Sequence, residues 1–309
     1  MSVGVLIANF GGPQSQAELE PFLRALLTDV LPLGPLSGVA AWLIASQRKN
    51  KVGPAYEHIG WSPIVPQTQD IAQRVAASLG GDVPVTAGMM FSPPSFHTAL
   101  TALKRQGVRR VIVAGLFPHE SMATSRAARR LILPHAGDLE LDFLPPFYDA
   151  PWYLSALASA IQRGIDATPG EGELHLLFSP HGLPVSYVRA GDPYPDQVRA
   201  TVDGVLAELG WRGPWHLGWQ SRVGPTKWLE PSTLTEVERI AGLGVKRLCV
   251  VPVSFICEGI ETLHEIDVEL ADHAHKHGLE HLHRAPALGP YDDALIAGLA
   301  GTIAERLHR

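Results

Sequence analysis

Residues 107–118 read GVRRVIVAGLFP, and residues 244–255 read GVKRLCVVPVSF. Each segment has a glycine turn with two basic residues, a run of aliphatic residues, and then a loop of unusual composition. Short apolar runs bounded by Gly or Pro are typical of strands buried on both faces. A fainter likeness links LIANFGGP at 6–13 with LFSPHGLP at 177–184. The pattern predicts two similar halves, although buried strands of unrelated origin also resemble one another.

Apolar runs of this kind alternate with segments of helical period along the chain. We expect strands at 3–9, 83–89, 110–116, 139–144, 174–179, 215–219, 247–253 and 280–285. We expect helices at 66–78, 94–106, 152–167, 195–209 and 234–243. This alternation predicts an α/β fold with parallel sheets and helices on both faces. We place the division near 151–170, which gives an N-terminal lobe at 1–160 and a C-terminal lobe at 161–309.

Composition excludes several classes of protein. The chain has 25 Lys and Arg against 31 Asp and Glu, a net charge of −6, so bulk nucleic-acid binding is not expected. Hydrophobic residues make up 46% and charged residues 18%, which favours a folded chain with a large core. Cys249 and Cys257 are too few for a disulfide framework. The start of the chain lacks signal-peptide features, and we expect a reducing, cytoplasmic compartment.

Polar segments follow the predicted strands, where ligands bind in sheets of this type. These segments are 9–13, 117–121, 179–184, 220–225 and 254–261, and we expect them to open into one cleft between the halves. None has the glycine pattern of a nucleotide site or a serine hydrolase. His181, between Pro180 and Gly182, is a candidate base in this cleft. A purely structural histidine is the alternative.

Five acidic residues recur at spacings of three or four: Glu258, Glu261, Glu265, Glu269 and Asp272. On an α-helix this spacing places all five on one side. Like charges at i,i+4 destabilise a helix by about 0.2–0.5 kcal/mol per pair, so we expect a compensating cation such as a metal ion. The alternative is a solvated helix face whose acids favour the helix dipole.

Histidines are the residue type with the most unusual count, 14 in all. Five of them cluster late in the chain: His273, His275, His277, His281 and His283. Their irregular spacing, with Lys276 and Gly278 between them, favours an exposed helix end and turn. Metal storage is the alternative for this cluster.

An apolar segment at 31–46 contains two prolines and is followed by Arg48, Lys49 and Lys51. Sixteen residues are too few to span a bilayer, which takes about 20. We expect a flap that covers an apolar, anionic ligand or touches a membrane surface. Burial in the core is the alternative.

Several segments together resemble one family, the ferrochelatases. They are FSPHGLP at 178–184, GDPYPDQ at 191–197, WQSRVGP at 219–225, WLEP at 228–231, VPVSF at 251–255 and GIETLHEID at 259–267. LIANFGGP at 6–13 and YEHIGWSP at 56–63 are similar to the N-terminal motifs of that family. The likeness covers most of the chain in the correct order.

The resemblance implies two Rossmann-like lobes of chelatase type with the active-site cleft between them. It implies a lyase that inserts ferrous iron into protoporphyrin IX or coproporphyrin III in heme biosynthesis, with no prosthetic group. His181 matches the active-site histidine of the family, and Glu261 matches its paired acid; both are then expected to contact the metal. Glu265 and Glu269 match outer positions that guide or bind metal. We expect no iron–sulfur cluster, because the chain ends at Arg309 without the extra cysteines.

The resemblance also implies a porphyrin site. Arg48, Lys51, Tyr56 and Ser62 fall where the family contacts the propionates, and 31–46 resembles the active-site lip. Phe10 is expected to form a wall of the pocket. We expect a monomer with no nucleic-acid partner, and peripheral membrane contact through the lip is left open.

Two positions depart from the family pattern. Gly259 stands where the family often has His, which removes one metal ligand, and Phe10 stands where some members have Tyr or Met. Two other functions share these features. One is a chelatase that inserts cobalt or nickel into another tetrapyrrole, and the other is a non-catalytic carrier of porphyrin or metal.

Overall fold

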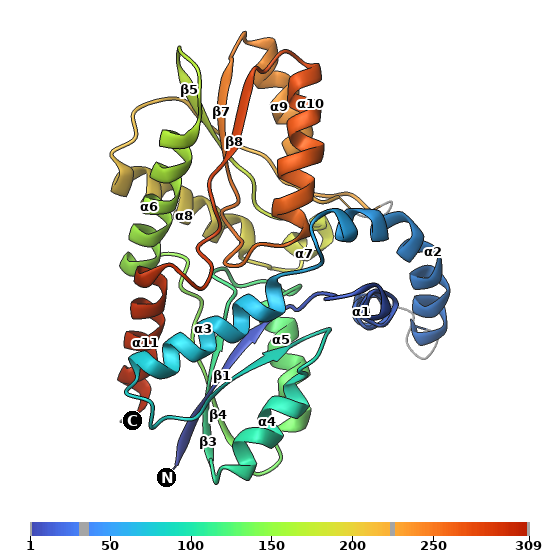
Figure 1. The fold of residues 1–309 in the computed structure, drawn as a ribbon, viewed down its shortest axis with the longest axis vertical. Helices are drawn as coiled ribbons and strands as arrows, with labels where there is room; N and C mark the ends of the chain where they lie inside the picture. Colours follow the sequence, from blue (N-terminus) through green and yellow to red (C-terminus); the bar gives the residue numbers. More distant parts are fainter. Residues whose placement is uncertain (1, 31–36, 223–225, 308–309) are drawn as a thin grey trace. The chain divides into compact units, whose positions relative to one another are not determined.

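The computed structural model describes residues 2–30, 37–222 and 226–307. The chain forms two compact units, each with one four-stranded sheet (Figure 1). The first unit consists of Met1–Leu116, Ala127–Leu144 and Leu299–Arg309. The second consists of Phe117–Arg126 and Pro145–Gly298.

The sheet of the first unit has the strand order β2-β1-β3-β4, and all its pairs are parallel. Its strands are β1 (Val3–Asn9), β2 (Val85–Met89), β3 (Arg110–Gly115) and β4 (Glu140–Phe143). Residues 4–9 of β1 are all buried, as expected of a central strand covered on both faces. Helices α3 (Ile64–Ser78) and α4 (Phe96–Arg105) pack on β1 and β2. The unit also contains the 3-10 helix Leu133–His135, and α5 (Ser125–Ile132) leads into it.

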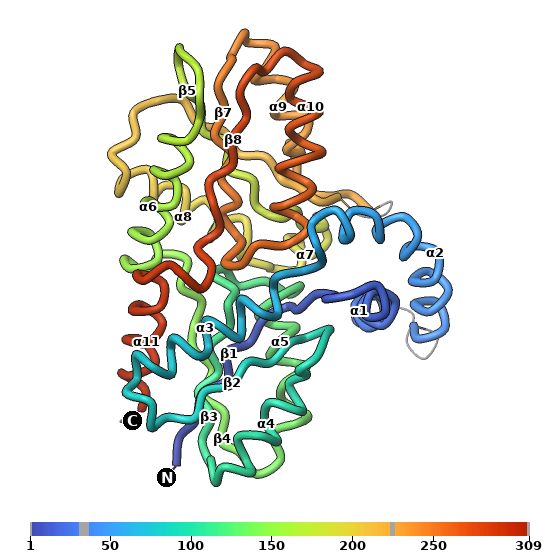
Figure 2. The backbone as a smooth tube through the Cα atoms, in the orientation of Figure 1, coloured from blue at the N-terminus to red at the C-terminus, as the bar shows by residue number. Residues whose placement is uncertain are grey.

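Two helices between β1 and α3 form a hairpin, α1 (Gln16–Val30) and α2 (Ser37–His58), and they pack on each other (Figure 2). Of the predicted apolar flap at 31–46, residues 31–36 lie outside the described residues, and 37–46 form the start of α2. Ala41 and Ala45 are fully buried, whereas Val39, Trp42 and Leu43 are 61%, 50% and 52% exposed. This part of α2 therefore has one buried side of small residues and one exposed apolar side.

The sheet of the second unit has the order β6-β5-β7-β8, also parallel throughout. Its strands are β5 (Leu174–Phe178), β6 (Trp215–Leu217), β7 (Arg247–Val251) and β8 (His281–Arg284). Strand for strand the order repeats that of the first unit. The likeness of 107–118 to 244–255 falls on the equivalent strands β3 and β7, and that of 6–13 to 177–184 falls on β1 and β5. The prediction of two similar α/β lobes with parallel sheets is confirmed.

Helices cover both faces of the second sheet (Figure 1). Leu248 and Val250 of β7 face a core made with α9 (Thr233–Gly242), the π-helix Glu261–Leu270 and α10 (Ala271–Lys276). Cys249, between them in sequence, faces the opposite side, because side chains alternate along a strand. On that side α6 (Pro151–Ala167) packs on β7 and β8, and α8 (Tyr194–Leu209) packs on α6. The remaining helices are α7 (Val185–Arg189) and α11 (Asp293–Leu307).

The predicted elements agree with this structure. All eight strands and all five helices that we expected are present, with ends that differ by a few residues. The predicted division between residues 160 and 161 falls within α6, which belongs to the second unit. The assignment of lobes to 1–160 and 161–309 stays a prediction.

Across the part of the chain that the structure describes, no helix is both long enough and apolar enough to cross a membrane.

The contact of α6 with the sheet yields a test of packing. A Cβ atom on Gly164 would lie 2.8 Å from the Ala285 Cα and 3.0 Å from the Cys249 Sγ, so Gly164→Ala must push the helix off the sheet. We expect this change to lower the free energy of unfolding by about 1–3 kcal/mol, measured by urea denaturation.

Gly301→Ala is the matched control, since Gly301 lies in a helix with nothing within 4 Å of the added carbon. This control should raise the free energy of unfolding by about 0.5–1 kcal/mol, because alanine loses less conformational entropy in a helix. Equal effects of the two changes would contradict the close packing of α6.

Candidate functional site

Three loops of the second unit meet at the carboxyl ends of β5, β6 and β7. The backbone N–H of Gln220, after β6, donates to the Pro180 carbonyl (3.0 Å), and the N–H of Gly182 donates back to the Gln220 carbonyl (2.7 Å). The N–H of His181 donates to the Ser254 Oγ after β7 (3.1 Å). His181 is therefore held by backbone contacts to both neighbouring loops, at the sheet edge where sequence analysis placed it.

The imidazole of His181 has aromatic surroundings. Trp228 and Phe255 present their rings at steep angles to it, with centroids 6.5 Å and 6.3 Å away. The residue keeps partial exposure, but desolvation of the ring lowers the pKa of His181 to about 4. At neutral pH this histidine is uncharged, so it has a lone pair with which to accept a proton or bind a metal ion.

The segment GDPYPDQ at 191–197 supports the loop of His181 through hydrogen bonds. The hydroxyl of Tyr194 donates to the His181 carbonyl (3.0 Å). The backbone N–H of Tyr194 donates to Asp192, whose other carboxylate oxygen accepts from the Ser121 hydroxyl (3.0 Å) and the Met122 N–H (2.7 Å). Asp192 is only 4% exposed. Sequence analysis found this motif by resemblance alone and assigned it no role; the structure makes it the support of the histidine loop.

A second uncharged histidine, His119, lies behind Tyr194 with its ring against the tyrosine ring (centroids 5.6 Å apart). Its Nε2 lies 3.0 Å from the Thr201 Oγ1, and that hydroxyl donates to the Tyr148 carbonyl, so Nε2 is the donor. The Nδ1 then has no hydrogen-bond partner among the described residues. Burial lowers the pKa of His119 to about 3. Sequence analysis did not single out His119, because only the tertiary structure brings it close to the Tyr194 that supports His181.

The acidic residues differ from their prediction in two ways. Glu261, Glu265 and Glu269 lie on a π-helix, with i→i+5 hydrogen bonds, and not on the expected α-helix. Glu258 precedes this helix, so the predicted row of five on one helix is wrong at its start. Asp272, at the other end of the predicted row, lies on α10. The spacing of four nevertheless keeps the three acids of the π-helix together, since the charges of Glu261 and Glu269 both act on Glu265.

We expected a cation to compensate the charge of the acidic residues, and at Glu258 this cation is the side chain of Arg284. The Glu258 carboxylate accepts from the Arg284 Nη1 (3.0 Å) and from the Ala287 N–H (3.0 Å). Arg284 also makes a two-pronged ion pair with Asp267 (2.8 and 2.9 Å). Glu258 is thus a structural residue that joins the start of the helix to β8. A metal ion is not needed to compensate its charge.

Glu261, Glu265 and Glu269 form a carboxylate row. The carboxyl groups of the first two are desolvated, and that of the third is exposed to solvent. Desolvation raises the pKa of Glu261. Desolvation and the charge of Glu261 raise the pKa of Glu265 to about 7, although the Ser221 hydroxyl, which donates to Glu265, acts in the opposite direction. Glu269 is exposed and lies 3.6 Å from the His264 Nε2.

One loop joins this row to His181. The side-chain amide of Gln220 donates to the Glu261 carbonyl (3.3 Å), and Ser221 reaches Glu265 from a left-handed backbone conformation (φ +63°). Such conformations cost energy in a non-glycine residue and cluster at functional sites. Because Gln220 also pairs with the loop of His181, the loop after β6 connects the histidine with the inner end of the carboxylate row.

The other predicted site residues lie in the first unit. Tyr56, near the end of α2, is buried and stacks on Trp61, with ring centroids 6.3 Å apart and an angle of 8°. Ser62 is buried beside them. Phe10, at the end of β1, packs edge to face on Phe91 (4.9 Å).

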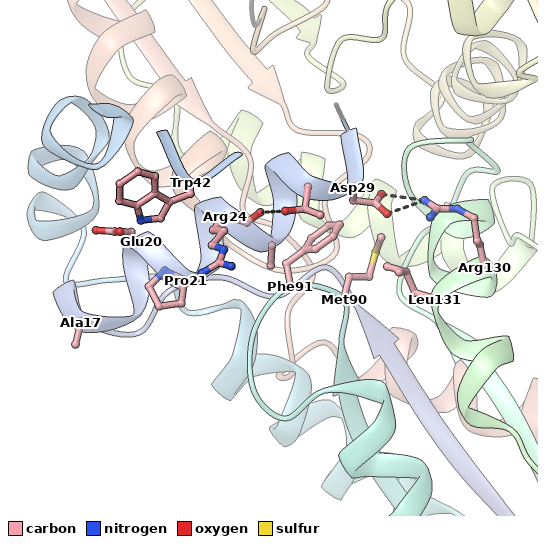
Figure 3. A pocket seen from close by; sticks show the side chains of 12 residues that line it. Ala17, Glu20, Pro21, Arg24, Asp29, Trp42, Met90, Phe91, Arg130 and Leu131 are labelled. Carbon is pink, nitrogen blue, oxygen red and sulfur yellow. Dashed lines mark hydrogen bonds and ion pairs between the residues drawn. The ribbon is translucent and has the colours of Figure 1, made fainter. Parts of the chain in front are cut away.

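Phe91 also lines a pocket of about 930 Å³ within the first unit (Figure 3). Apolar side chains from α1, α2 and α5, including Trp42 and Leu131, form much of its wall. In Figure 3 the Asp29–Arg130 ion pair (2.8 and 2.9 Å) lies at the end of the pocket away from Trp42. Arg24 of α1 is a further cation in the wall, whereas Arg48 and Lys51 are not among the lining residues. Sequence analysis missed Arg24, since nothing distinguishes it from any other charged residue of an amphipathic helix.

Known proteins resemble this chain over nearly its whole length. The family model of ferrochelatase matches residues 2–307. A ferrochelatase of Geotalea uraniireducens is 39% identical over 92% of this chain and 92% of its own length. A ferrochelatase of Synechococcus sp. (strain JA-3-3Ab) is 38% identical over 98% and 93%.

Solved structures show the same architecture at lower identity. SirB from Bacillus subtilis with Fe³⁺ superposes with a TM-score of 0.59 at 13% identity and covers 99% of this chain and 95% of its own. CbiX, the terminal enzyme of siroheme biosynthesis in denitrifying bacteria, gives a TM-score of 0.52 at 18% identity, with 98% of each chain covered. These two show the chelatase fold alone. The sequence matches extend over nearly the whole length, and the chain therefore belongs to the ferrochelatase family.

Proposed function

We propose that this chain inserts ferrous iron into a free-base porphyrin, with His181 as the base and Glu261 as its paired acid. Its family consists of metal chelatases, lyases that insert iron into porphyrin for heme synthesis. The observation that supports the residue roles best is the uncharged His181 between two aromatic rings, joined through one loop to the carboxylate row.

The reaction requires an acceptor for two protons. A free-base porphyrin loses two pyrrole N–H protons as Fe²⁺ sheds its water and binds the four nitrogens. His181 is uncharged and takes one proton directly. The other proton passes to a carboxylate, and Glu265, with a pKa of about 7, both accepts and releases protons near neutral pH.

The metal is a substrate, and we propose that it contacts Glu269, Glu265, Glu261 and finally His181. The exposed Glu269 meets the hydrated ion first, and the desolvated inner carboxylates strip water from it. Imidazole and carboxylate donors hold Fe²⁺ less firmly than four porphyrin nitrogens do, so transfer to the ring is favourable. Gly259 adds no ligand; its N–H and carbonyl bond to the Thr262 hydroxyl and support the helix start.

We propose that the pocket of the first unit binds the porphyrin. Its volume of about 930 Å³ is within the usual range for small-molecule sites. Phe10 packs on Phe91, which lines the pocket. Tyr56 and Ser62 lie near the end of α2, the helix that contributes Trp42 to the pocket wall. Arg24 is the lining cation best suited to a propionate, and Arg48 and Lys51 follow Trp42 along α2.

The choice of porphyrin, the oligomeric state, the compartment and the lack of a cofactor are proposed from the sequence. Protoporphyrin IX and coproporphyrin III both present propionates and stay the two predicted substrates. We propose a cytoplasmic monomer without a prosthetic group or iron–sulfur cluster. The exposed side of α2, with Val39 and Leu43, is the surface that would touch a membrane.

Replacing His181 tests the base. His181→Ala should lower the rate of porphyrin metallation about 10²–10⁴-fold, the usual contribution of a positioned base. Metallation is followed anaerobically with Fe²⁺ by the visible absorption bands of each porphyrin. His275→Ala, at an exposed position on α10, is the matched control and should keep the wild-type rate.

Normal turnover by His181→Ala would contradict the role of the base. Porphyrin binding by the wild type without turnover would support a carrier, and a preference for Co²⁺ or Ni²⁺ over Fe²⁺ would support the other chelatases.

The raised pKa of Glu265 predicts a pH dependence. Below about pH 7 this carboxyl is protonated and binds metal poorly, so the KM for Fe²⁺ should fall as the pH rises through 7. In Glu265→Gln the KM should be about tenfold higher at pH 8, with that pH dependence lost. Porphyrin affinity, measured by fluorescence quenching, should stay the same. An unchanged pH profile in the variant would exclude Glu265 as the titrating group.

Changes in the pocket should weaken porphyrin binding and leave the KM for Fe²⁺ unchanged, the opposite of what we expect for Glu265→Gln. Arg24→Ala should raise the porphyrin Kd about tenfold or more, since a charge-assisted hydrogen bond contributes about 1.5–3 kcal/mol. The KM for Fe²⁺ should not change. If Arg24→Ala bound porphyrin normally while Arg48→Ala and Lys51→Ala bound it weakly, the propionates would lie along α2 and not at Arg24.

A further inference from the structure

Three metal-ligating side chains converge on the second unit, outside the carboxylate row. Glu238 lies on α9, His273 lies on α10, and His277 follows the last residue of α10. One ligand atom of each lies within 4.8 Å of the others. The two histidines, four residues apart, share one side of the helix, and α9 packs against α10. The expectation of an exposed helix end and turn holds for His275 and His277 only, because His273 is half-buried and His281 and His283 lie in β8. The fold also adds a carboxylate from another helix.

A hydrogen bond to the backbone orients the ring of His277. Its Nδ1 lies 2.9 Å from the His273 carbonyl oxygen. A carbonyl oxygen only accepts, so Nδ1 has the proton, and Nε2 is the ring nitrogen left to ligate a metal ion. Histidines that ligate metals usually donate their second ring N–H to a carbonyl or carboxylate in this way, which fixes the tautomer and the orientation of the ring.

His273 supplies the second donor. Its Nε2 lies 3.1 Å from the Glu238 Oε1, yet the geometry forms no hydrogen bond, and the nitrogen is shielded from solvent. The two imidazole rings lie close together, with centroids 4.4 Å apart. A shielded nitrogen without a hydrogen bond is unfavourable unless another partner is present. A cation at this point would be contacted by the nitrogen and by the carboxylate oxygen.

We propose that Glu238, His273 and His277 bind a divalent first-row transition-metal ion such as Zn²⁺, Co²⁺ or Ni²⁺. Two imidazoles and one carboxylate are the donors these ions prefer, and three protein ligands leave a position for water. The bound ion would join α10 to α9. The site uses none of the residues assigned to iron insertion, so the proposal does not depend on the proposed reaction.

The test compares three full-length proteins by equilibrium dialysis and calorimetry with Zn²⁺ alone. Wild type should bind one equivalent more than the double variant His273→Ala/His277→Ala. His275→Ala is the matched control, because His275 lies on the same helix but outside the cluster, and it should bind as the wild type does. Zn²⁺ should raise the Tm of the wild type and of His275→Ala more than that of the double variant.

A conservative variant keeps the test decisive if the double variant folds poorly. Glu238→Gln retains size and polarity on α9 and should weaken Zn²⁺ at this site about tenfold or more. The Co²⁺ absorption spectrum should lose the corresponding contribution. The proposal is overturned if Glu238→Gln and the double variant keep the wild-type stoichiometry and affinity, or if His275→Ala loses as much zinc as the double variant does.

Discussion

The backbone pairing between the loops after β5 and β6 is the contact on which the site depends. Gly182 donates to the Gln220 carbonyl at 2.7 Å, and a Cβ atom at residue 182 would lie at that same distance from the carbonyl oxygen and 3.2 Å from Trp228. Only glycine therefore permits the approach. The pairing aims His181 at its aromatic neighbours, and through Gln220 and Ser221 it also positions the carboxylate row. One close backbone contact thus positions His181 and the carboxylate row together.

Desolvation then sets the charge of each group, in opposite directions for bases and acids. It lowers the pKa of His181 and His119 and raises that of Glu261 and Glu265. Each of these shifts favours the uncharged form of its group. Between about pH 4 and 6.5 the folded chain binds fewer protons at the two histidines than the unfolded chain does, so these residues reduce stability as the pH falls. These pKa directions are the ones that the proposed roles of His181 and the carboxyls require.

The two units repeat one strand order, but their connections differ. Between β5 and β6 the second unit has α7 and α8, whereas between β1 and β2 the first unit has α1, α2 and α3. The additional hairpin lines the pocket of the first unit and exposes apolar residues of α2. In the second unit the candidate site residues lie in and around the loops after β5, β6 and β7. One strand order thus carries a pocket in one unit and, in our proposal, proton and metal binding in the other.

The sequence by itself determined the strands, the repeat, the position of His181 at a strand end and the spacing of Glu261, Glu265 and Glu269. These features depend on local periodicity and on the order of elements, which a linear pattern contains. Only the tertiary structure decided the π-helix, the pairing of Glu258 with Arg284, the cation Arg24 in the pocket wall, and the approach of Glu238 to His273. Each of these depends on which distant side chain packs against which, and no spacing along the chain specifies that.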